Sequence, residues 1–151
     1  MIDIPRLIAT VFGLGRLPLA PGTWGSAAAL PIAWTLAPHG LILSLTGAIL
    51  LTLIGIWATA RTLAHSNIAD PPEIVVDEIC AQWIVLALLP REPLAYVLGF
   101  AAFRAADIFK PWPAGWADRN MAGAAGVMAD DLLAAPYAVA AAWAVLWVIG
   151  R

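Results

Sequence analysis

The sequence contains little charge, little histidine and a single cysteine. Only 12% of its 151 residues are charged, whereas an ordinary soluble domain carries about 25%. The one cysteine, Cys80, excludes an internal disulfide, and because no histidine stands near it in the sequence we interpret it as a packing residue rather than a nucleophile. The formal net charge of −2 provides no basic field that would attract nucleic acid. The scarcity of charge is the most informative of these absences, since it argues against a soluble domain.

Apolar residues take the place of the missing charge. They make up 62% of the chain, and the mean hydropathy is +0.86. This composition predicts a single integral-membrane domain covering residues 1–151, with no internal repeat and no low-complexity linker. The N-terminus does not resemble a cleaved signal, because Asp3 and Pro5 precede Arg6 and the apolar run that follows is short. We expect this first segment to be amphipathic or partly embedded.

Five apolar runs predict the fold class, a compact polytopic all-α membrane domain with about five membrane-embedded segments. The runs cover residues 24–37, 41–60, 74–89, 94–109 and 127–149. The second is the clearest spanning helix, since about 20 residues are needed to cross a bilayer. The third and fourth are joined by a tight turn, so this pair either crosses fully or forms a re-entrant hairpin. The last run places Asp130 and Asp131 in its first turn.

Three polar segments separate these runs, at residues 13–26, 61–78 and 104–129. With five crossings they all emerge on one face of the membrane, and a re-entrant hairpin would leave them on that face as well. This face carries most of the cations: Arg6, Arg16, Arg61, Arg104, Lys110 and Arg119, against Arg91 and Arg151 on the other. The positive-inside rule therefore predicts that the polar segments face the cytoplasm.

The first polar segment is rich in glycine and proline. Glycines allow backbone N–H groups to approach a ligand, and Thr23 and Ser26 add hydroxyl donors ahead of a helix whose N-terminus would attract an anion. The alternative is a plain turn in which Thr23 or Ser26 caps the helix. The pattern fits an anion site, although a plain turn is the more common meaning of such a segment.

The second polar segment ends in Asp77 and Glu78, which run directly into an apolar helix. Their side chains project about 100° apart on a helix, so one can bind a metal while the other supports it. Hard carboxylate oxygens suit Mg²⁺. The alternative is a solvated helix start, where acids interact favourably with the helix dipole. That alternative fits Asp70 and Glu73 better than Asp77 and Glu78.

The third polar segment places Arg104, Asp107 and Lys110 three residues apart, along one predicted helical stripe. They form either an ion-pair ladder or a site in which the two cations hold a phosphate while Asp107 binds a metal. The proline after Lys110 predicts that the helix ends there. Arg119, further along, is a weaker phosphate candidate, because a charge on the cytoplasmic face needs no special role.

The acidic pair Asp130 and Asp131 stands at the start of a long apolar run. Ionisable groups inside a membrane cost from about 2.5 kcal/mol upward and are usually functional. His39 and His65 lie in predicted loops without metal-site spacing, and we assign them no role. Carboxylates, arginine and lysine thus gather at one membrane face, without a serine–histidine or cysteine–histidine pair. This combination is typical of metal-assisted phosphoryl transfer, here at the level of lipid headgroups.

Four pieces of the sequence, in order, resemble the phosphatidylglycerophosphatase A family, and the likeness spans residues 13–134. The pieces are residues 18–26 (PLAPGTWGS), 70–78 (DPPEIVVDE), 103–113 (FRAADIFKPWP) with 115–119 (GWADR), and 128–131 (MADD). After the aspartate pair, residues 134–136 read Ala-Ala-Pro where the family pattern leads us to expect a glycine. That departure concerns helix packing more than chemistry.

The resemblance implies a lipid phosphatase of the bacterial inner membrane, with its active site facing the cytoplasm. It would release the terminal phosphate of phosphatidylglycerophosphate, giving phosphatidylglycerol, with Mg²⁺ as cofactor. By motif position the implied metal-binding acids are Asp77, Glu78, Asp107, Asp130 and Asp131, with Asp77, Asp107 and Asp131 also catalytic. The implied phosphate contacts are Arg104 and Lys110. The first polar segment adds Thr23 and Ser26 as candidates, and the third adds Arg119.

Our hypothesis is that an activated water attacks phosphorus while Asp77 or Asp131 accepts its proton. The expected partners are the lipid substrate and membrane lipids, with no obligate protein partner evident. Two rival functions remain open. One is a phosphatase for a different lipid phosphate. The other is a small ion or proton transporter, which predicts acids staggered through the bilayer instead of clustered near one side.

Overall fold

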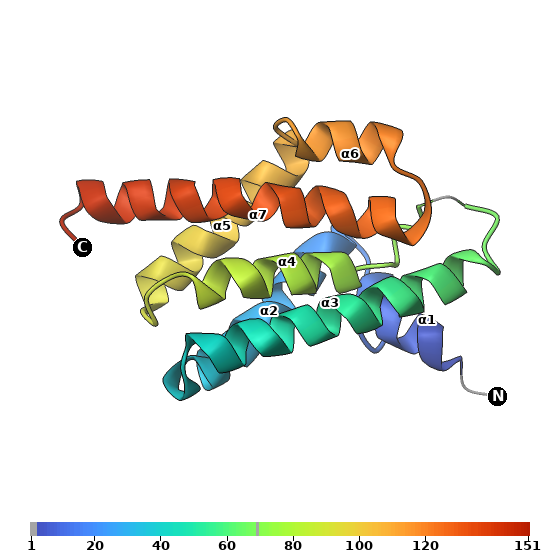
Figure 1. The fold of residues 1–151 in the computed structure, drawn as a ribbon, viewed down its shortest axis with the longest axis horizontal. Helices are drawn as coiled ribbons and strands as arrows, with labels where there is room; N and C mark the ends of the chain where they lie inside the picture. The colour runs from blue at the N-terminus through green and yellow to red at the C-terminus, as the bar shows by residue number, and fades with distance from the viewer. Residues whose placement is uncertain (1–2, 69) are drawn as a thin grey trace.

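The computed structural model describes residues 3–68 and 70–151, and within them it contains α-helices, two short 3₁₀ helices and no strand (Figure 1). In chain order they are α1 (Ile4–Ala9), η1 (Leu14–Arg16), α2 (Pro21–Leu36), η2 (Ala37–His39), α3 (Leu41–Leu63), α4 (Val76–Ala87), α5 (Pro93–Phe109), α6 (Ala114–Asn120) and α7 (Gly123–Val148). The predicted all-α class is confirmed for this part of the chain.

The central element of the fold is α4. It packs against α2, α3, α5 and α7, and nine of its twelve residues are buried. A helix enclosed on all sides needs apolar residues around its whole circumference, which the stretch after Glu78 supplies. Cys80 is one of these residues and is fully buried, as expected of a packing residue. Because α4 is central, the acids in its first turn are carried toward the interior.

Two helices in the described residues, α3 and α7, are long and apolar enough to cross a membrane, with 23 and 26 residues. Only 22% and 33% of their most apolar windows is buried, whereas the core helix of a soluble protein would be mostly buried. The exposed face of α3 carries large apolar side chains, among them Ile42, Ile49, Leu53 and Trp57. So much exposed apolar surface is costly in water and is favourable in lipid.

The remaining long helices fall short of a straight crossing. α2, α4 and α5 contain 16, 12 and 17 residues, compared with the roughly 20 that a bilayer requires. The predicted tight turn is present, because α4 ends at Ala87 and α5 begins at Pro93. Whether this pair crosses the membrane or returns to its own side stays a prediction, as does the count of five embedded segments.

The polar segments gather toward one end of the molecule. In Figure 1 the α2–α3 turn, the α4–α5 turn and the C-terminus lie toward the left, whereas α1, the end of α3 and the start of α7 lie toward the right. The loop between α3 and α4 and the region around α6 are on this right-hand side as well. Segments that are far apart in sequence are therefore close enough to build one site.

Two helix starts differ from the prediction. α7 begins at Gly123, so Asp130 and Asp131 lie in its third turn instead of its first. α2 begins at Pro21, so the following glycines lie inside a helix and not in a loop. A Cβ atom on Gly25 would lie 2.8 Å from Cβ of Val75. Glycine is unfavourable in a helix interior, but here the close packing of α2 on the start of α4 requires a residue without a side chain.

Candidate metal and phosphate site

Three carboxylates from two helices converge in the interior. Asp77 and Glu78 lie in the first turn of α4, and Asp131 reaches them from α7; each offers an oxygen, and these oxygens lie within 4.8 Å of one another. We call Asp77, Glu78 and Asp131 the carboxylate cluster. Although Asp77 and Glu78 point in different directions from the helix, both reach the same point. The sequence alone did not require them to share a ligand.

The carboxylate cluster is short of hydrogen-bond donors. Oε2 of Glu78 and Oδ2 of Asp131 are buried without a hydrogen-bond partner among residues 3–68 and 70–151, and Oδ1 of Asp77 accepts only the backbone N–H of Glu78, at 3.0 Å. Buried anionic oxygens this close repel one another and are costly unless a cation lies among them. An all-oxygen donor set of this kind fits a hard divalent cation such as Mg²⁺.

Arg104 of α5 brings positive charge to the edge of the carboxylate cluster. Its Nη1 forms a 2.8 Å ion pair with Asp107 and donates a 3.2 Å hydrogen bond to Oγ of Ser26. Asp107 in turn is close enough to act electrostatically on both Glu78 and Asp131. Nε of Arg104 is buried without an acceptor in the described part of the chain. A buried N–H donor beside a cation site is suited to an oxygen of a bound phosphate.

Gly22 of α2 allows this approach. A Cβ atom at Gly22 would lie 2.1 Å from Oε1 of Glu78 and 3.2 Å from Nη1 of Arg104. Any larger residue would therefore push Glu78 or Arg104 out of place. The glycine-rich segment contributes to the site by close packing. Gly22 and Gly25 are helical, so these two glycines are not part of an anion-binding loop.

Thr23 and Ser26 lie inside α2, so the alternative in which one of them caps a helix does not hold; Ala20 is at the N-cap. The hydroxyl of Ser26 is fully buried, donates to the carbonyl oxygen of Gly22 at 2.8 Å and accepts from Arg104. Ser26 thus orients Arg104. Thr23 is partly buried one turn earlier on the same helix.

Lys110 leaves the predicted stripe with Arg104 and Asp107. It lies at the C-cap of α5 with φ of 45°, in the left-handed region, and the helix ends at Phe109 as the following proline predicted. This turn directs the ammonium group to Asp118 of α6 and, at 2.6 Å, to Oδ2 of Asp130. We call Lys110, Asp118 and Asp130 the lysine cluster. Burial alone would lower the pKa of Lys110, but the hydrogen bonds to Asp118 and Asp130 raise it above its usual value.

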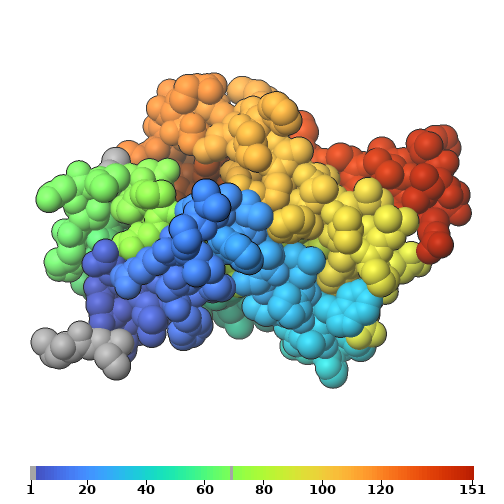
Figure 2. Space-filling view, turned by 180° about the vertical axis from the view of Figure 1, so that it is seen from behind, coloured from blue at the N-terminus to red at the C-terminus, as the bar shows by residue number. Residues whose placement is uncertain are grey.

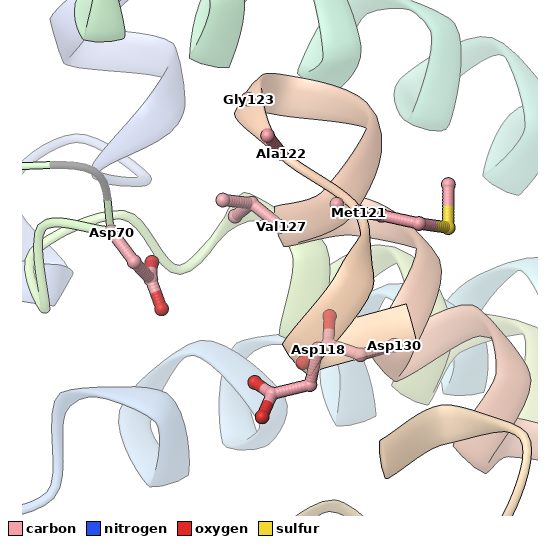
Figure 3. A pocket seen from close by; sticks show the side chains of 8 residues that line it. Asp70, Asp118, Met121, Ala122, Gly123, Val127 and Asp130 are labelled. Atoms are coloured by element: carbon pink, nitrogen blue, oxygen red, sulfur yellow. The ribbon is translucent and has the colours of Figure 1, made fainter. Parts of the chain in front are cut away.

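A cavity of about 200 Å³ opens beside the lysine cluster. Figure 3 shows Asp70 on one side of it and Asp118 and Asp130 on the other. Burial raises the pKa of Asp70, and repulsion from Asp130 raises it further. The residues that line this cavity do not include the carboxylate cluster, so the cavity adjoins the candidate metal site through Asp130 and is not itself that site.

Asp70 and Glu73 lie in the loop before α4, so the alternative of a solvated helix start does not apply to them; Asp77 and Glu78 occupy the first turn. Glu73 instead joins the N-terminal region to this loop, through ion pairs of 2.7 Å with Arg6 and 3.0 Å with Arg16. Partial burial alone would raise the pKa of Glu73, but these two arginines lower it below its usual value. Glu73 is thus structural.

Some contributors to the site were missed in the sequence. Asp118 was not singled out, although it lies in the GWADR piece that carried part of the resemblance. Gly22 gave no signal beyond glycine richness, because its closest contacts come from α4 and α5. Arg119 is exposed on α6, one residue beyond Asp118. The Nδ1 atom of His65, just past the end of α3, lies 3.0 Å from the carbonyl oxygen of Arg61.

Comparison with known proteins finds relatives that cover most of the chain. A family model described as phosphatidylglycerophosphatase A matches residues 7–146. The phosphatidylglycerophosphatase A of Escherichia coli (strain K12) is 36% identical, over 85% of this chain and 76% of that protein. The one of Haemophilus influenzae is 37% identical, over 95% of this chain and 90% of that protein. A protein of Bacteroides thetaiotaomicron named putative phosphatidylinositol-3-phosphatase is 40% identical, over 97% and 96% respectively. No solved structure matches the chain.

Proposed function

This chain belongs to the phosphatidylglycerophosphatase A family, and from that premise we propose that it hydrolyses the terminal phosphate of phosphatidylglycerophosphate. The products are phosphatidylglycerol and inorganic phosphate. The observation that carries the proposal is the position of Arg104 beside the carboxylate cluster. Oxygens that need a cation lie next to a buried N–H donor that can bind an anion. A divalent cation with a phosphate ester meets both needs at once.

We propose Mg²⁺ as the cation, held by Asp77, Glu78 and Asp131. When bound, Mg²⁺ supplies Lewis-acid polarisation of the phosphate and activation of a water molecule. The other two acids of the predicted metal set, Asp107 and Asp130, are at the edge of the cluster, where each is paired with a cation of the chain.

The chain's own residues bind and orient the phosphate in this proposal. Arg104, held by Asp107 and Ser26, balances charge on the phosphoryl oxygens through Nε. Asp131 takes the proton of the attacking water at Oδ2, the oxygen that has no partner in residues 3–68 and 70–151. The new bond from the water oxygen to phosphorus replaces the ester P–O bond, and the departing alkoxide takes up a proton to give the hydroxyl of phosphatidylglycerol. Lys110 lies next to this centre through Asp130 and adds positive charge on its cavity side. Thr23 and Arg119 stay candidate contacts for the rest of the headgroup.

We further propose that residues 1–151 form one domain in the bacterial inner membrane, with α2, α3, α4, α5 and α7 embedded. The site end then faces the cytoplasm. Support comes from the cations, which are concentrated in the polar segments at that end, whereas Arg91 and Arg151 are at the other. Labelling of single cysteines introduced at Arg61 and Arg91 tests the orientation. The proposal requires that a thiol reagent added outside intact cells labels the cysteine of Arg91→Cys and does not label the cysteine of Arg61→Cys.

The function is tested by measuring phosphate release from the purified protein against a panel of lipid phosphates, with Mg²⁺ and with a chelator. We expect release from phosphatidylglycerophosphate that the chelator abolishes and that Mg²⁺ restores. Equal release with chelator present would contradict the metal assignment. No release from any lipid would favour the ion transporter, which the clustering of the acids otherwise disfavours.

A second candidate is a phosphatase for a different lipid phosphate. It is favoured by the 40% identity to the protein named putative phosphatidylinositol-3-phosphatase. The same panel separates the two candidates, provided that it contains phosphatidylinositol 3-phosphate. Preferential release from that lipid would replace our assignment of the substrate while leaving the assignment of the site intact.

A further inference from the structure

An apolar groove runs along the seam between α2 and α5, away from the carboxylates. It has a volume of about 460 Å³ and is lined mainly by Leu30, Pro31 and Trp34 of α2 and by Pro93, Tyr96 and Val97 of α5. Figure 2 shows α2, in blue to light blue, bordering the yellow start of α5 on this face of the molecule. A groove of this volume is in the range of small-molecule sites.

The groove offers hydrocarbon surface and little else. Two of its lining residues carry a side-chain hydroxyl, Thr35 and Tyr96. The hydroxyl of Thr35 already donates to the carbonyl oxygens of its own helix, at 2.9 Å from that of Pro31, and the hydroxyl of Tyr96 is buried without a partner among the described residues. Pro31 and Pro93 have no backbone N–H to donate. The carbonyl oxygen of Trp34 accepts a 3.0 Å hydrogen bond from Arg91. With one such hydroxyl in the groove, a sugar, a peptide or a headgroup would lose most of its hydrogen bonds here, whereas an acyl chain has none to lose.

The groove lies on the same α2–α5 seam as the edge of the candidate site. The hydrogen bond from Arg104 to Ser26 joins α5 to α2 at the site end of the same seam. Leu30 is one turn beyond Ser26 on α2, and Val97 is about 10 Å before Arg104 on α5, at a rise of about 1.5 Å per residue. At the end of the seam away from the site, the guanidinium carbon of Arg91 lies 4.5 Å from the centroid of the Trp34 ring.

We propose that this groove binds one acyl chain of the lipid whose phosphate is held at Arg104. The inference rests on the lipid phosphatase function proposed above and adds a determinant of chain length to it. A chain that enters at the Arg104–Ser26 end and runs toward Arg91 lies along the membrane normal, with its headgroup at the site. The groove then selects lipids by the length of that chain and orients the glycerol backbone below the phosphate.

The test is to fill the groove from its exposed rim. Val97→Trp places a large side chain across the groove, and Leu53→Trp on α3 is the matched control, since Val97 is 60% exposed and Leu53 is 59% exposed. Each variant is assayed in mixed micelles with phosphatidylglycerophosphate carrying either two palmitoyl or two hexanoyl chains. We expect Val97→Trp to lower the palmitoyl-to-hexanoyl ratio of kcat/KM about tenfold, as for the loss of roughly two buried methylene groups. An unchanged ratio, or an equal fall in Leu53→Trp, overturns the proposal.

A binding measurement separates failure of the groove from failure of the function. A lipid phosphate with a photoreactive diazirine near the end of one chain should label α2 and α5 peptides more strongly than α3 peptides, and Val97→Trp should remove that preference. Even labelling of the three helices overturns the groove. If the unaltered protein releases no phosphate from either lipid, the proposed function fails, and labelling alone decides whether the groove holds an acyl chain.

Discussion

The two acidic neighbours on α7, Asp130 and Asp131, lie in clusters of opposite character. Asp130 belongs to the lysine cluster, where Lys110 forms ion pairs with both Asp118 and Asp130. Asp131 belongs to the carboxylate cluster, where three acids meet without a lysine or arginine ion pair to any of them in the described residues. One step along a helix, about 100° of rotation, separates the two environments.

This difference separates an acid that is ion-paired within the chain from acids that need a bound ligand. The charge of Asp130 is balanced within the chain by Lys110 on Oδ2, although its Oδ1 is buried without a partner among the described residues. Removing one partner of such an ion pair costs mainly stability. Three buried carboxylates without such a partner store repulsion that a divalent cation relieves on binding. We therefore propose the carboxylate cluster as the metal site, and the lysine cluster as the brace that holds the end of α5 and α6 against α7.

The largest effect is expected from Asp131→Asn. It removes one charged ligand without changing shape, so phosphate release should fall about 10³-fold or more while the protein remains folded in the membrane. The measurement is phosphate release by purified variant and parent, with circular dichroism in detergent as the control for folding. Near-normal turnover would remove Asp131 from the essential set.

A smaller loss is expected from Gly22→Ala. The added methyl group would lie 2.1 Å from Oε1 of Glu78, so Glu78 must move, and misplacing a ligand by this amount should cost about 10²-fold in turnover. The apparent Mg²⁺ requirement should rise in parallel. If turnover falls while the Mg²⁺ requirement stays that of the parent, then Gly22 acts on something other than Glu78.

Asp130→Asn tests directly whether the lysine cluster is structural. Because Lys110 keeps Asp118 as a partner, turnover should fall only about tenfold, and the loss should appear mainly as a lower midpoint of thermal unfolding. Asp118→Asn, which changes the other acid of the same cluster, is the matched control and should behave alike. A loss as large as that of Asp131→Asn would place Asp130 among the metal ligands instead of in the brace.

The smallest effect is expected from Glu73→Gln, far from both clusters. Arg6 and Arg16 are about half exposed, so their ion pairs with Glu73 contribute only ~1 kcal/mol, and turnover should change less than twofold. Since the folded pKa of Glu73 lies below the usual 4.5, this stabilisation is present above that pH and is lost as pH falls through the folded pKa. Unfolding midpoints from pH 7 to pH 3.5 should therefore converge for parent and variant at the acidic end.

Much of the fold followed from hydropathy. The long apolar runs predicted α3, α5 and α7, and the tight turn before Pro93 was recognised from its prolines. The starts of α2 and α7 were missed because the glycines there have low helix propensity, and in α2 the close packing of Gly25 on Val75 at the start of α4 requires a glycine inside the helix. Local propensity cannot report a contact made by a distant segment.

The acids of the site were recognised from charge in apolar sequence, but their division into two clusters was not. Helical spacing put Lys110 on a stripe with Asp107, and only the left-handed turn at Lys110 redirects it to Asp118 and Asp130. In the same way, the meeting of Glu78 with Asp131 depends on how α4 crosses α7. Sequence spacing fixes direction within one helix and says nothing of the distance between two.

The central claim is that the carboxylate cluster, and not the lysine cluster, binds the divalent cation. Thermal unfolding of the purified protein titrated with Mg²⁺ tests it without any turnover. A ligand at about 100 times its Kd stabilises the folded state by about 2.7 kcal/mol, so the midpoint of the parent and of Asp118→Asn should rise and saturate. The midpoint of Asp131→Asn should stay flat and, with chelator present, should lie at or above that of the parent. A full Mg²⁺-dependent rise in Asp131→Asn would contradict the account.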